Sequence, residues 1–281
     1  MTKILNIDNI PLSREYRGMG RHCNAPLPVM VFFILGVMCS ISSGIFPAQA
    51  LPADTAVSAF EQHAKYLYET MELKKSGLDL VCFRYALIGY FNLKRKGVIK
   101  REDIISIVDF RQSCNDRRFY TIDLAKRQLI YHTFVAHGKR SGVLYARHFS
   151  NKIGSLQSSL GFFVTGNTYN GEYGYSLYLF GMEKGFNDKA RARRIVVHGA
   201  YYVGSSIISR DGKIGQTLGC PALPAGPHIA IIDMIKGGTC LFQFYDDKKY
   251  LAQSIFLDVH GAAAQFATDF FPFAQLTRNA P

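Results

Sequence analysis

The chain beyond residue 50 opens with apolar residues at helical spacing. Five of them recur at intervals of 3, 4, 3 and 4 positions: Val57, Phe60, Ala64, Leu67 and Met71. This period places them on one helical face, with Asp54 as the expected N-cap and an end near Gly77. A second stripe follows at similar spacing, formed by Leu80, Phe83, Leu87 and Tyr90. Basic residues 94–96 precede Gly97, where cations suit the end of a helix. We therefore expect two scaffold helices.

The pattern changes at about residue 105 to short runs rich in Ile, Val, Phe, Tyr and Thr with Gly-rich connections. These runs span residues 105–110, 119–122, 129–135, 161–165, 177–180 and 195–197. Such runs are typical of strands. A short helix over 228–235 and a strand over 240–245 complete the unit. The weak apolar pattern of residues 252–281 predicts no particular element. The sequence thus predicts a mainly β fold with N-terminal helices.

The first fifty residues have the layout of a signal peptide. Arg14, Arg17 and Arg21 precede an apolar run over 29–38, and Ala48-Gln49-Ala50 supplies a small-residue cleavage site. The run is shorter than the roughly 20 residues that span a bilayer. We expect cleavage after Ala50, with an uncleaved inner-membrane anchor as the alternative. The protein is then exported to the periplasm or cell envelope of a bacterium, with transient membrane association through this segment left open.

Composition and charge narrow the class of protein further. The chain has 281 residues, 48% of them hydrophobic and 19% charged, which excludes a disordered chain or a small disulfide scaffold. Its net charge of +12 suits nucleic acid, an anionic membrane or an acidic cell-wall polymer. Because export and dispersed basic residues argue against nucleic acid, we expect no nucleic-acid partner.

Several signatures of metal and phosphate chemistry are missing from the sequence. It contains no G-x-x-x-x-G-K, no H-E-x-x-H and no C-x-x-C. His132 and His137 are five residues apart in a strand-like stretch, so they would point to opposite faces. We interpret both as surface or structural histidines, and we expect no metal and no cofactor.

One cysteine and one histidine stand where a nucleophile and its base would be expected. His198-Gly199 ends an apolar strand, and Gly219-Cys220 is followed directly by Pro221 in a glycine-marked turn. A thiol held on a tight bend suits a nucleophile, and a nearby histidine lowers its pKa. The alternatives are a buried thiol and a disulfide. If the dyad forms, Cys220 is labelled by alkylating reagents at neutral pH before the other cysteines.

At these residues the sequence resembles the L,D-transpeptidase family of the YkuD type, in its murein L,D-transpeptidase branch. The family pattern is His-Gly, a spacer, then Ser/Thr-x-Gly-Cys, and it stands here as His198-Gly199 and Thr217-Leu218-Gly219-Cys220. Further blocks occur in family order: Ala136 to Lys139, Phe149 to Asn151, Ser158 to Phe162, Tyr169 to Gly171, Gly174 to Leu177, Ile231 to Asp233 and Lys236 to Gly238. The resemblance covers about residues 78–247.

Three departures from the family pattern affect acceptor binding more than the dyad. Leu218 stands where many members have a second histidine, Pro221-Ala222 replace a common apolar-polar ending, and the spacer before Thr217 is slightly long.

The resemblance implies a β-sandwich or barrel catalytic domain and a peptidoglycan stem peptide as donor. It divides the chain into residues 1–50 (signal peptide), 51–98 (helical region packed on the catalytic domain), 99–250 (catalytic domain) and 251–281 (tail). Cys220 would attack the bond between an L-centre and terminal D-Ala, and His198 would move the proton. The product goes to an amine acceptor, or to water in the alternative of an L,D-carboxypeptidase. A non-catalytic peptidoglycan-binding module is the alternative outside enzymes.

The resemblance also suggests supporting residues. The Gly199 carbonyl would orient the imidazole. Backbone N–H groups from Leu218 and Gly219 to Cys220 would form an oxyanion hole, with Thr217 in support. Substrate contacts are expected from Tyr169, Tyr175, Arg194 and Ser159, with sheet packing and a solvated basic edge as the alternatives. Cys240 is interpreted as a buried strand thiol. Cys82 and Cys114 are the pair that we would join by a disulfide, although two free thiols fit equally.

Overall fold

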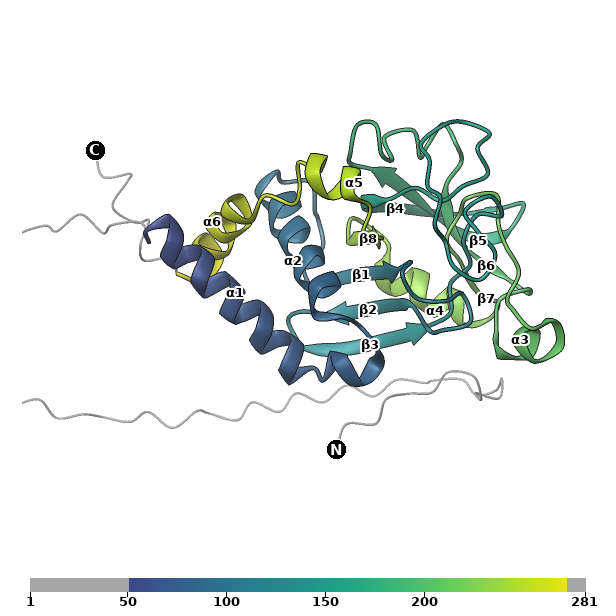
Figure 1. Ribbon diagram of the computed structural model, residues 1–281, viewed down its shortest axis with the longest axis horizontal. Coiled ribbons are helices and arrows are strands. Elements are labelled where there is room, and N and C mark those ends of the chain that lie inside the picture. The colour runs from purple at the N-terminus through teal and green to yellow at the C-terminus, as the bar shows by residue number, and fades with distance from the viewer. Residues whose placement is uncertain (1–50, 272–281) are drawn as a thin grey trace, which may run out of the picture.

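A mixed sheet of eight strands forms the centre of the protein (Figure 1), and the computed structural model describes residues 51–271. The strands are β1 (Ile104–Asp109), β2 (Phe119–Asp123), β3 (Gln128–Thr133), β4 (Gly161–Gly171), β5 (Gly174–Gly181), β6 (Val196–Ala200), β7 (Ala222–Pro224) and β8 (Cys240–Phe244). Their order is β3-β2-β1-β8-β4-β5-β6-β7. Neighbours are antiparallel except β1 with β8 and β6 with β7. The mainly β, barrel-like fold with N-terminal helices that the sequence predicts is confirmed.

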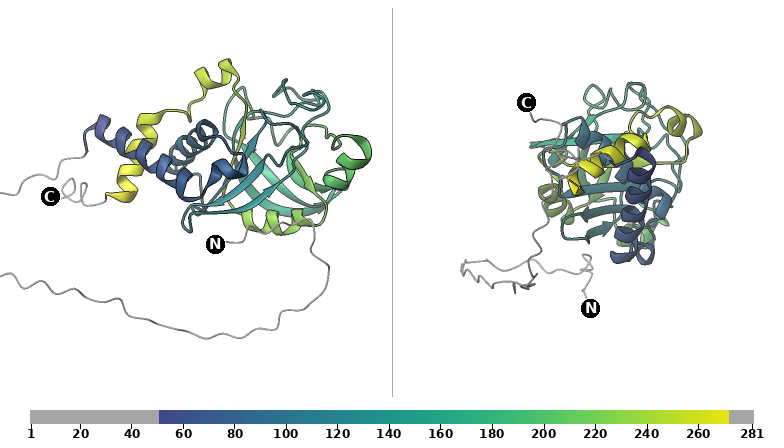
Figure 2. Two further views of the ribbon diagram at one scale, coloured as in Figure 1. Left: turned by 60° about the horizontal axis from the view of Figure 1, so that its bottom comes forward. Right: turned by 90° about the vertical axis from the view of Figure 1, so that its left-hand side faces the viewer.

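Helices gather at one end of this sheet (Figures 1 and 2). They are α1 (Ala53–Thr70), the 3₁₀ turn η2 (Leu73–Ser76), α2 (Leu80–Arg95) and α6 (Val259–Phe270). Phe60, Phe91 and Phe266 meet edge to face, with centroids 5.8 to 5.9 Å apart. One hydrophobic core runs from these helices into the sheet. The division into a helical region and a catalytic domain stays a prediction.

The tail beyond residue 250, for which the sequence predicted no element, is helical in its described part. It contains the end of α5 (Lys248–Gln253) and all of α6. The amide of Asn92 donates hydrogen bonds to the carbonyls of Phe256 (2.9 Å) and Asp258 (2.7 Å). The tail is therefore fastened to α2 by contacts between residues far apart in the sequence, which local periodicity does not reveal.

The first helix differs from the sequence prediction at both ends. Pro52 occupies the N-cap position and Asp54 lies in the first turn, where a carboxylate still suits the helix dipole. The helix ends at Thr70 and not near Gly77, because Glu72 adopts a left-handed conformation with φ of 51°. The residues up to Gly77 form the separate turn η2.

The four described cysteines are free and buried, so the Cys82–Cys114 disulfide does not form. Cys82 lies in the main core, whereas Cys114 belongs to a second, smaller cluster with Phe134 and Ala136. The two thiols therefore belong to different packing units. Cys240 is fully buried on β8, as its interpretation as a strand thiol requires.

The contact between α2 and the sheet depends on a glycine. A Cβ at Gly89 would overlap the ring of Phe162, which itself stacks on Phe242 with centroids 4.1 Å apart. We expect Gly89→Ala to lower the free energy of unfolding by about 1–3 kcal/mol through overpacking. Thermal melting measures the loss. Val81→Ala, at an exposed position of α2, is the control, and equal melting temperatures of the two variants would contradict this packing.

The remaining short elements are α3 (Ser205–Asp211) and α4 (Pro227–Ile235). The sequence predicted α4 but neither α3 nor the three-residue strand β7. Within residues 51–271 no helix is both long and apolar enough to span a membrane. The signal-peptide prediction concerns residues 1–50, which lie outside the described residues.

Candidate active site

β6 and the turn before β7 bring the candidate nucleophile and base to adjacent positions. His198 on β6 pairs in register with Ala222 of the parallel strand β7, so Cys220, two residues earlier, lies beside the start of β6. The N–H of Val196 points to its sulfur at 3.5 Å, and the thiol donates to the carbonyl of Arg194 at 3.5 Å. Val196 and His198 face the same side of the sheet.

The hydroxyl group of Thr217 stabilises the turn that carries Cys220. Thr217 Oγ1 donates to the carbonyl of Cys220 at 2.8 Å and accepts from the N–H of Gly219 at 3.0 Å. Gly219 has φ of 131°, and a Cβ there would lie 2.8 Å from the carbonyl oxygen of Gln157. Only glycine fits such a position. The Gly-Cys sequence thus reflects backbone geometry as well as chemistry.

His198 is almost fully buried and its ring orientation is fixed. Nδ1 lies 3.0 Å from the Gly199 carbonyl, so Nδ1 carries the proton and Nε2 is left as the acceptor. The Tyr173 ring stacks on the imidazole with centroids 4.6 Å apart. Burial lowers the pKa of His198, and the nearby His228 lowers it further. The side chain is therefore a neutral base at neutral pH.

The Cys220 thiol is neutral as well, which differs from the thiolate expected from the sequence. Burial raises its pKa to about 11, while the Val196 N–H and the charge of Arg193 act in the opposite direction. Within residues 51–271 no hydrogen bond joins the thiol to the imidazole, because the S–H points to Arg194. The structure thus holds an uncharged thiol in the turn before β7 and an uncharged imidazole on the neighbouring strand β6.

This state predicts how Cys220 reacts with a small alkylating reagent. Because the thiolate is the reactive form, its labelling rate should be slow at pH 7 and rise with pH toward a midpoint near 11. Cys220 should still be labelled first, since the other three described thiols have no exposed surface. His198→Gln should leave the rate within about twofold. Peptide mapping by mass spectrometry over pH 5–11 measures it, and a plateau already reached below pH 7 would demonstrate a preformed ion pair.

Arg193 is the cation whose charge lowers the pKa of Cys220. Its guanidinium donates to neutral groups, namely the carbonyls of Ser150 and Gln157 and the hydroxyls of Ser155 and Ser159. No carboxylate pairs with it among the described residues. It also packs on Gly219, 3.3 Å from the position of a Cβ there. Its charge therefore remains uncompensated next to the nucleophile turn.

Most of the described chain matches the model of a known protein family. Residues 74–244 match the model described as the L,D-transpeptidase catalytic domain. The chain belongs to this family. The L,D-transpeptidase domain therefore comprises α2, all eight strands and the nucleophile turn, and it includes most of the region that the sequence resemblance covered.

Solved structures of L,D-transpeptidases are also similar to this chain. They include the enzyme from Mycobacterium smegmatis (11% identity, 51% of this chain and 59% of that one, TM-score 0.31). Others are residues 123–326 of the Xylanimonas cellulosilytica enzyme (10%, 50% and 60%, 0.30) and L,D-transpeptidase 1 of Mycobacterium tuberculosis (10%, 51% and 62%, 0.29). The match spans about six tenths of the length of these structures. No curated protein matches the chain.

The other residues predicted for the site of this transpeptidase domain are only partly brought together. Tyr169 pairs with Ser176, which pairs with His198, so Tyr169 lies in the row that crosses the sheet to the imidazole. Tyr175 points to the opposite face, where its hydroxyl donates to Asp233 of α4 at 2.6 Å. Tyr175 thus faces away from His198, because alternate residues of a strand face opposite sides, and its contact with substrate stays a prediction.

Ser159 and Arg194 have indirect places in the site. Ser159 is buried and its hydroxyl donates to the Ser150 carbonyl at 2.9 Å while contacting Arg193. The side chain of Arg194 is exposed, and its contact with Cys220 is made by the backbone carbonyl. Arg191 is stacked on Tyr178, 3.9 Å from the ring centroid. Of the three arginines, only Arg193 faces the nucleophile turn.

His228 was missed by the sequence analysis. It lies at the start of α4, and a Cβ at Gly199 would overlap its ring. This explains the glycine after His198, since β6 and α4 approach too closely for a side chain. Its Nδ1 is buried with no hydrogen-bond partner among the described residues. Only its position as the first residue of a predicted helix was visible in the sequence.

His132 and His137 are structural histidines, as expected. His132 stacks on Tyr120 with centroids 4.7 Å apart. His137 is buried against Arg118 at 2.7 Å, and burial together with that cation lowers its pKa to about 4. Its carbonyl accepts from the N–H of Thr217 at 2.9 Å, which ties the nucleophile turn to the preceding loop. Within residues 51–271 no group of three or more metal-ligating side chains gathers.

Proposed function

We propose that the protein is an L,D-transpeptidase that cleaves a peptidoglycan tetrapeptide stem before its terminal D-Ala and passes the acyl group to an amine. The observation that carries this proposal is the placement of Cys220 beside the β6 strand that holds His198, within the family's own motif. A nucleophile with a neighbouring base is the minimum that acyl transfer requires.

The resting state requires that proton transfer accompany attack. The Cys220 sulfur forms a bond to the stem carbonyl carbon while its proton moves to Nε2 of His198. His198 then returns this proton to the D-Ala nitrogen as the C–N bond breaks, and a thioester remains. An acceptor amine loses a proton to His198 and attacks the thioester, which regenerates the thiol. Cys220 and His198 thus become charged only during the reaction.

The backbone of the nucleophile turn suggests which donors would stabilise the oxyanion. The N–H of Gly219 is already bonded to Thr217, so it is removed from the expected set. The N–H groups of Leu218 and Cys220 have no partner within residues 51–271, and we assign the oxyanion hole to them. Thr217 supports the turn, and the charge of Arg193 stabilises the thiolate as it forms.

Exposed side chains around the imidazole suggest where the donor stem binds. Tyr173, Leu218 and Tyr201 are exposed to 46%, 55% and 82%, and Tyr173 covers His198. We place the stem along these side chains with Tyr169 farther along the same face. Arg194 stands at the rim, and Ser159 acts through Arg193 and not on substrate.

Incubation of the purified protein with a disaccharide tetrapeptide, with and without an amine acceptor, tests the reaction. Mass spectrometry should show loss of D-Ala and, with the amine, a cross-linked product. Release of D-Ala to the tripeptide alone would assign water as the acceptor. No D-Ala release under either condition would leave a peptidoglycan-binding module.

We further propose that the protein acts in the cell envelope after cleavage behind Ala50. N-terminal sequencing of the exported protein should begin at Leu51, because Ala48 and Ala50 supply the small side chains that signal peptidase requires. A membrane-retained chain beginning at Met1 would show an anchor instead.

A further inference from the structure

A lysine-ringed cavity lies beside the proposed active site and takes no part in the chemistry described above. Its volume is about 530 Å³, within the usual range of ligand pockets. Phe149, Leu160 and Phe186 supply its apolar lining. Phe149 is braced by Phe110 and Tyr245, at centroid distances of 5.5 and 5.1 Å. The cavity is therefore built on fixed aromatic side chains.

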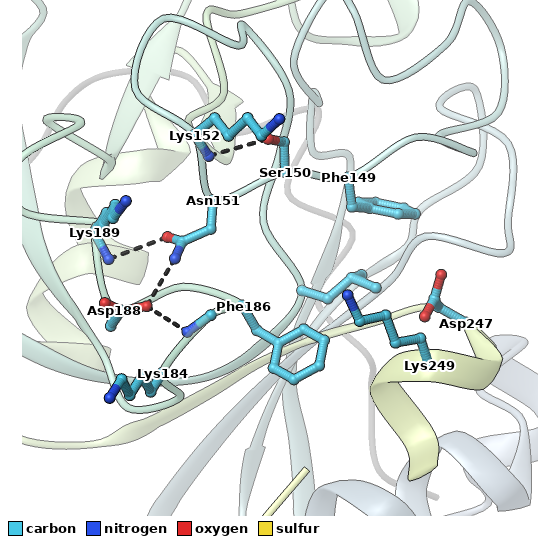
Figure 3. Close-up of a pocket in the computed structure, with 12 residues that line it drawn as sticks. Phe149, Ser150, Asn151, Lys152, Lys184, Phe186, Asp188, Lys189, Asp247 and Lys249 are labelled. Carbon is cyan, nitrogen blue, oxygen red and sulfur yellow. Dashed lines mark hydrogen bonds between the residues drawn. The ribbon is translucent and has the colours of Figure 1, made fainter. Parts of the chain in front are cut away.

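Four lysines surround this apolar lining. Figure 3 shows Lys249 extending from α5 between Phe149 and Phe186, and Lys152, Lys184 and Lys189 on the segments opposite, where the ammonium group of Lys184 points away from Phe186. None of the four ammonium groups has an ion pair with a residue of the described chain. Four unpaired cations at one cavity repel one another, and that repulsion is relieved by a bound anion.

The two carboxylates at the cavity are already engaged by the protein. Asp188 accepts hydrogen bonds from the N–H of Gly185 (2.6 Å) and the amide of Asn151 (2.7 Å), and these donors lower its pKa. Asp247 caps α5 by accepting from the N–H of Tyr250 at 2.7 Å. Hydrogen bonds fix both carboxylates in the wall, and the charge of Lys189 also lowers the pKa of Asp188. Because the four lysines outnumber these two carboxylates, the cavity keeps a net positive charge.

The cavity and the nucleophile are connected by one stretch of chain. Residues 184–186, 188 and 189 line the cavity, and the same segment continues to Arg193 and Arg194 beside Cys220. Across the cavity, the Ser150 carbonyl accepts from Arg193. None of the cavity residues contacts Cys220 or His198, so the cavity is a separate subsite next to the reacting one.

We propose that this cavity binds the acidic stem peptides of the peptidoglycan strand beyond the stem that reacts. Ammonium groups spread around an apolar cavity suit an extended ligand that carries several carboxylates and little other charge. This assignment rests on the proposed function for the identity of the polymer. The cavity would then be a second binding site for the polymer, and a soluble single stem would not occupy it.

The test measures retention on isolated sacculi stripped of phosphate-containing polymers, in the Cys220→Ala background to prevent turnover. The double variant Lys184→Glu/Lys249→Glu should reduce retention about tenfold at low salt, where exposed charges act most strongly. Lys65→Glu/Lys74→Glu is the control with the same change in net charge, at exposed lysines of the helical end. It should change retention by less than about twofold. Amidation of the sacculus carboxylates should lower retention of the parent to the level of the cavity variant.

With Cys220 intact, the cavity variant should keep kcat/KM for a soluble disaccharide tetrapeptide within about twofold, and its melting temperature should be unchanged. Equal retention of the cavity and control variants would overturn the assignment, as would retention that survives amidation. Retention that appears only when phosphate polymers are present would assign the cavity to phosphate and overturn it too. A parallel loss of soluble turnover would place these lysines in the reacting subsite. If the protein with Cys220 intact releases no D-Ala, yet retention of the Cys220→Ala protein depends on the lysines, the proposed function fails and the binding role of the cavity stands.

Discussion

Cys220→Ala should abolish D-Ala release from a tetrapeptide stem, with a loss of about a thousandfold or more, because the other three thiols of residues 51–271 have no exposed surface from which to form the thioester. Cys220→Ser should do nearly the same, since a neutral hydroxyl in this buried place is a weaker nucleophile than the thiol. The initial rate of D-Ala release, followed by mass spectrometry, measures both. Circular dichroism should show an unchanged fold, because the substitutions are small and the two hydrogen bonds that they remove are long, at 3.5 Å each.

Cys240→Ala is the matched control for loss of a buried sulfur. Cys240 has no exposed surface and lies on β8, so this variant should lose stability but keep its turnover per folded molecule. Wild-type turnover in Cys220→Ala would refute the mechanism. A loss in Cys240→Ala that equals the loss in Cys220→Ala would also count against it, provided that both variants are folded.

His198→Gln should lower kcat by about 10² to 10⁴, the usual contribution of a general acid and base. Glutamine keeps a similar volume beneath Tyr173 and a donor toward Gly199, but it cannot accept the Cys220 proton. Gly199→Ala is not a suitable control variant, since a Cβ at this position would overlap the ring of His228. Tyr175→Phe is suitable, because its hydroxyl bonds Asp233 on the opposite face of the sheet and turnover should be retained.

The pH profile of the wild-type protein provides a second readout of the same group. His198 must be neutral to accept the proton, and burial lowers its pKa below 6.5. Turnover should therefore persist as pH falls through 6.5 and be lost only below it. On the alkaline side the neutral thiol persists toward a pKa of about 11. An acid limb of kcat/KM centred above 6.5 would contradict a neutral resting imidazole.

Most strands could be predicted from the sequence, because the residue patterns that indicate a strand are local. The strand-rich runs gave six strands and β8 to within a few residues, apart from the extended ends of β4 and β5. The turn Gly219-Cys220 could be recognised because glycine at a left-handed position and a thiol next to proline are local features. α6 could not, since its apolar face is defined only by packing on Phe60 and Phe91.

The sequence by itself determined the class of fold, the candidate nucleophile and base, and the family to which they point. These depend on residue types at short spacing, which the chain carries wherever it folds. The tertiary structure alone decided that Cys82 and Cys114 stay apart, that Tyr175 faces away from the site and that Arg193 faces it. It also decided that the Cys220 thiol is neutral, because burial arises from chain segments far apart in the sequence, and burial controls the pKa more strongly than the identity of the neighbouring residues.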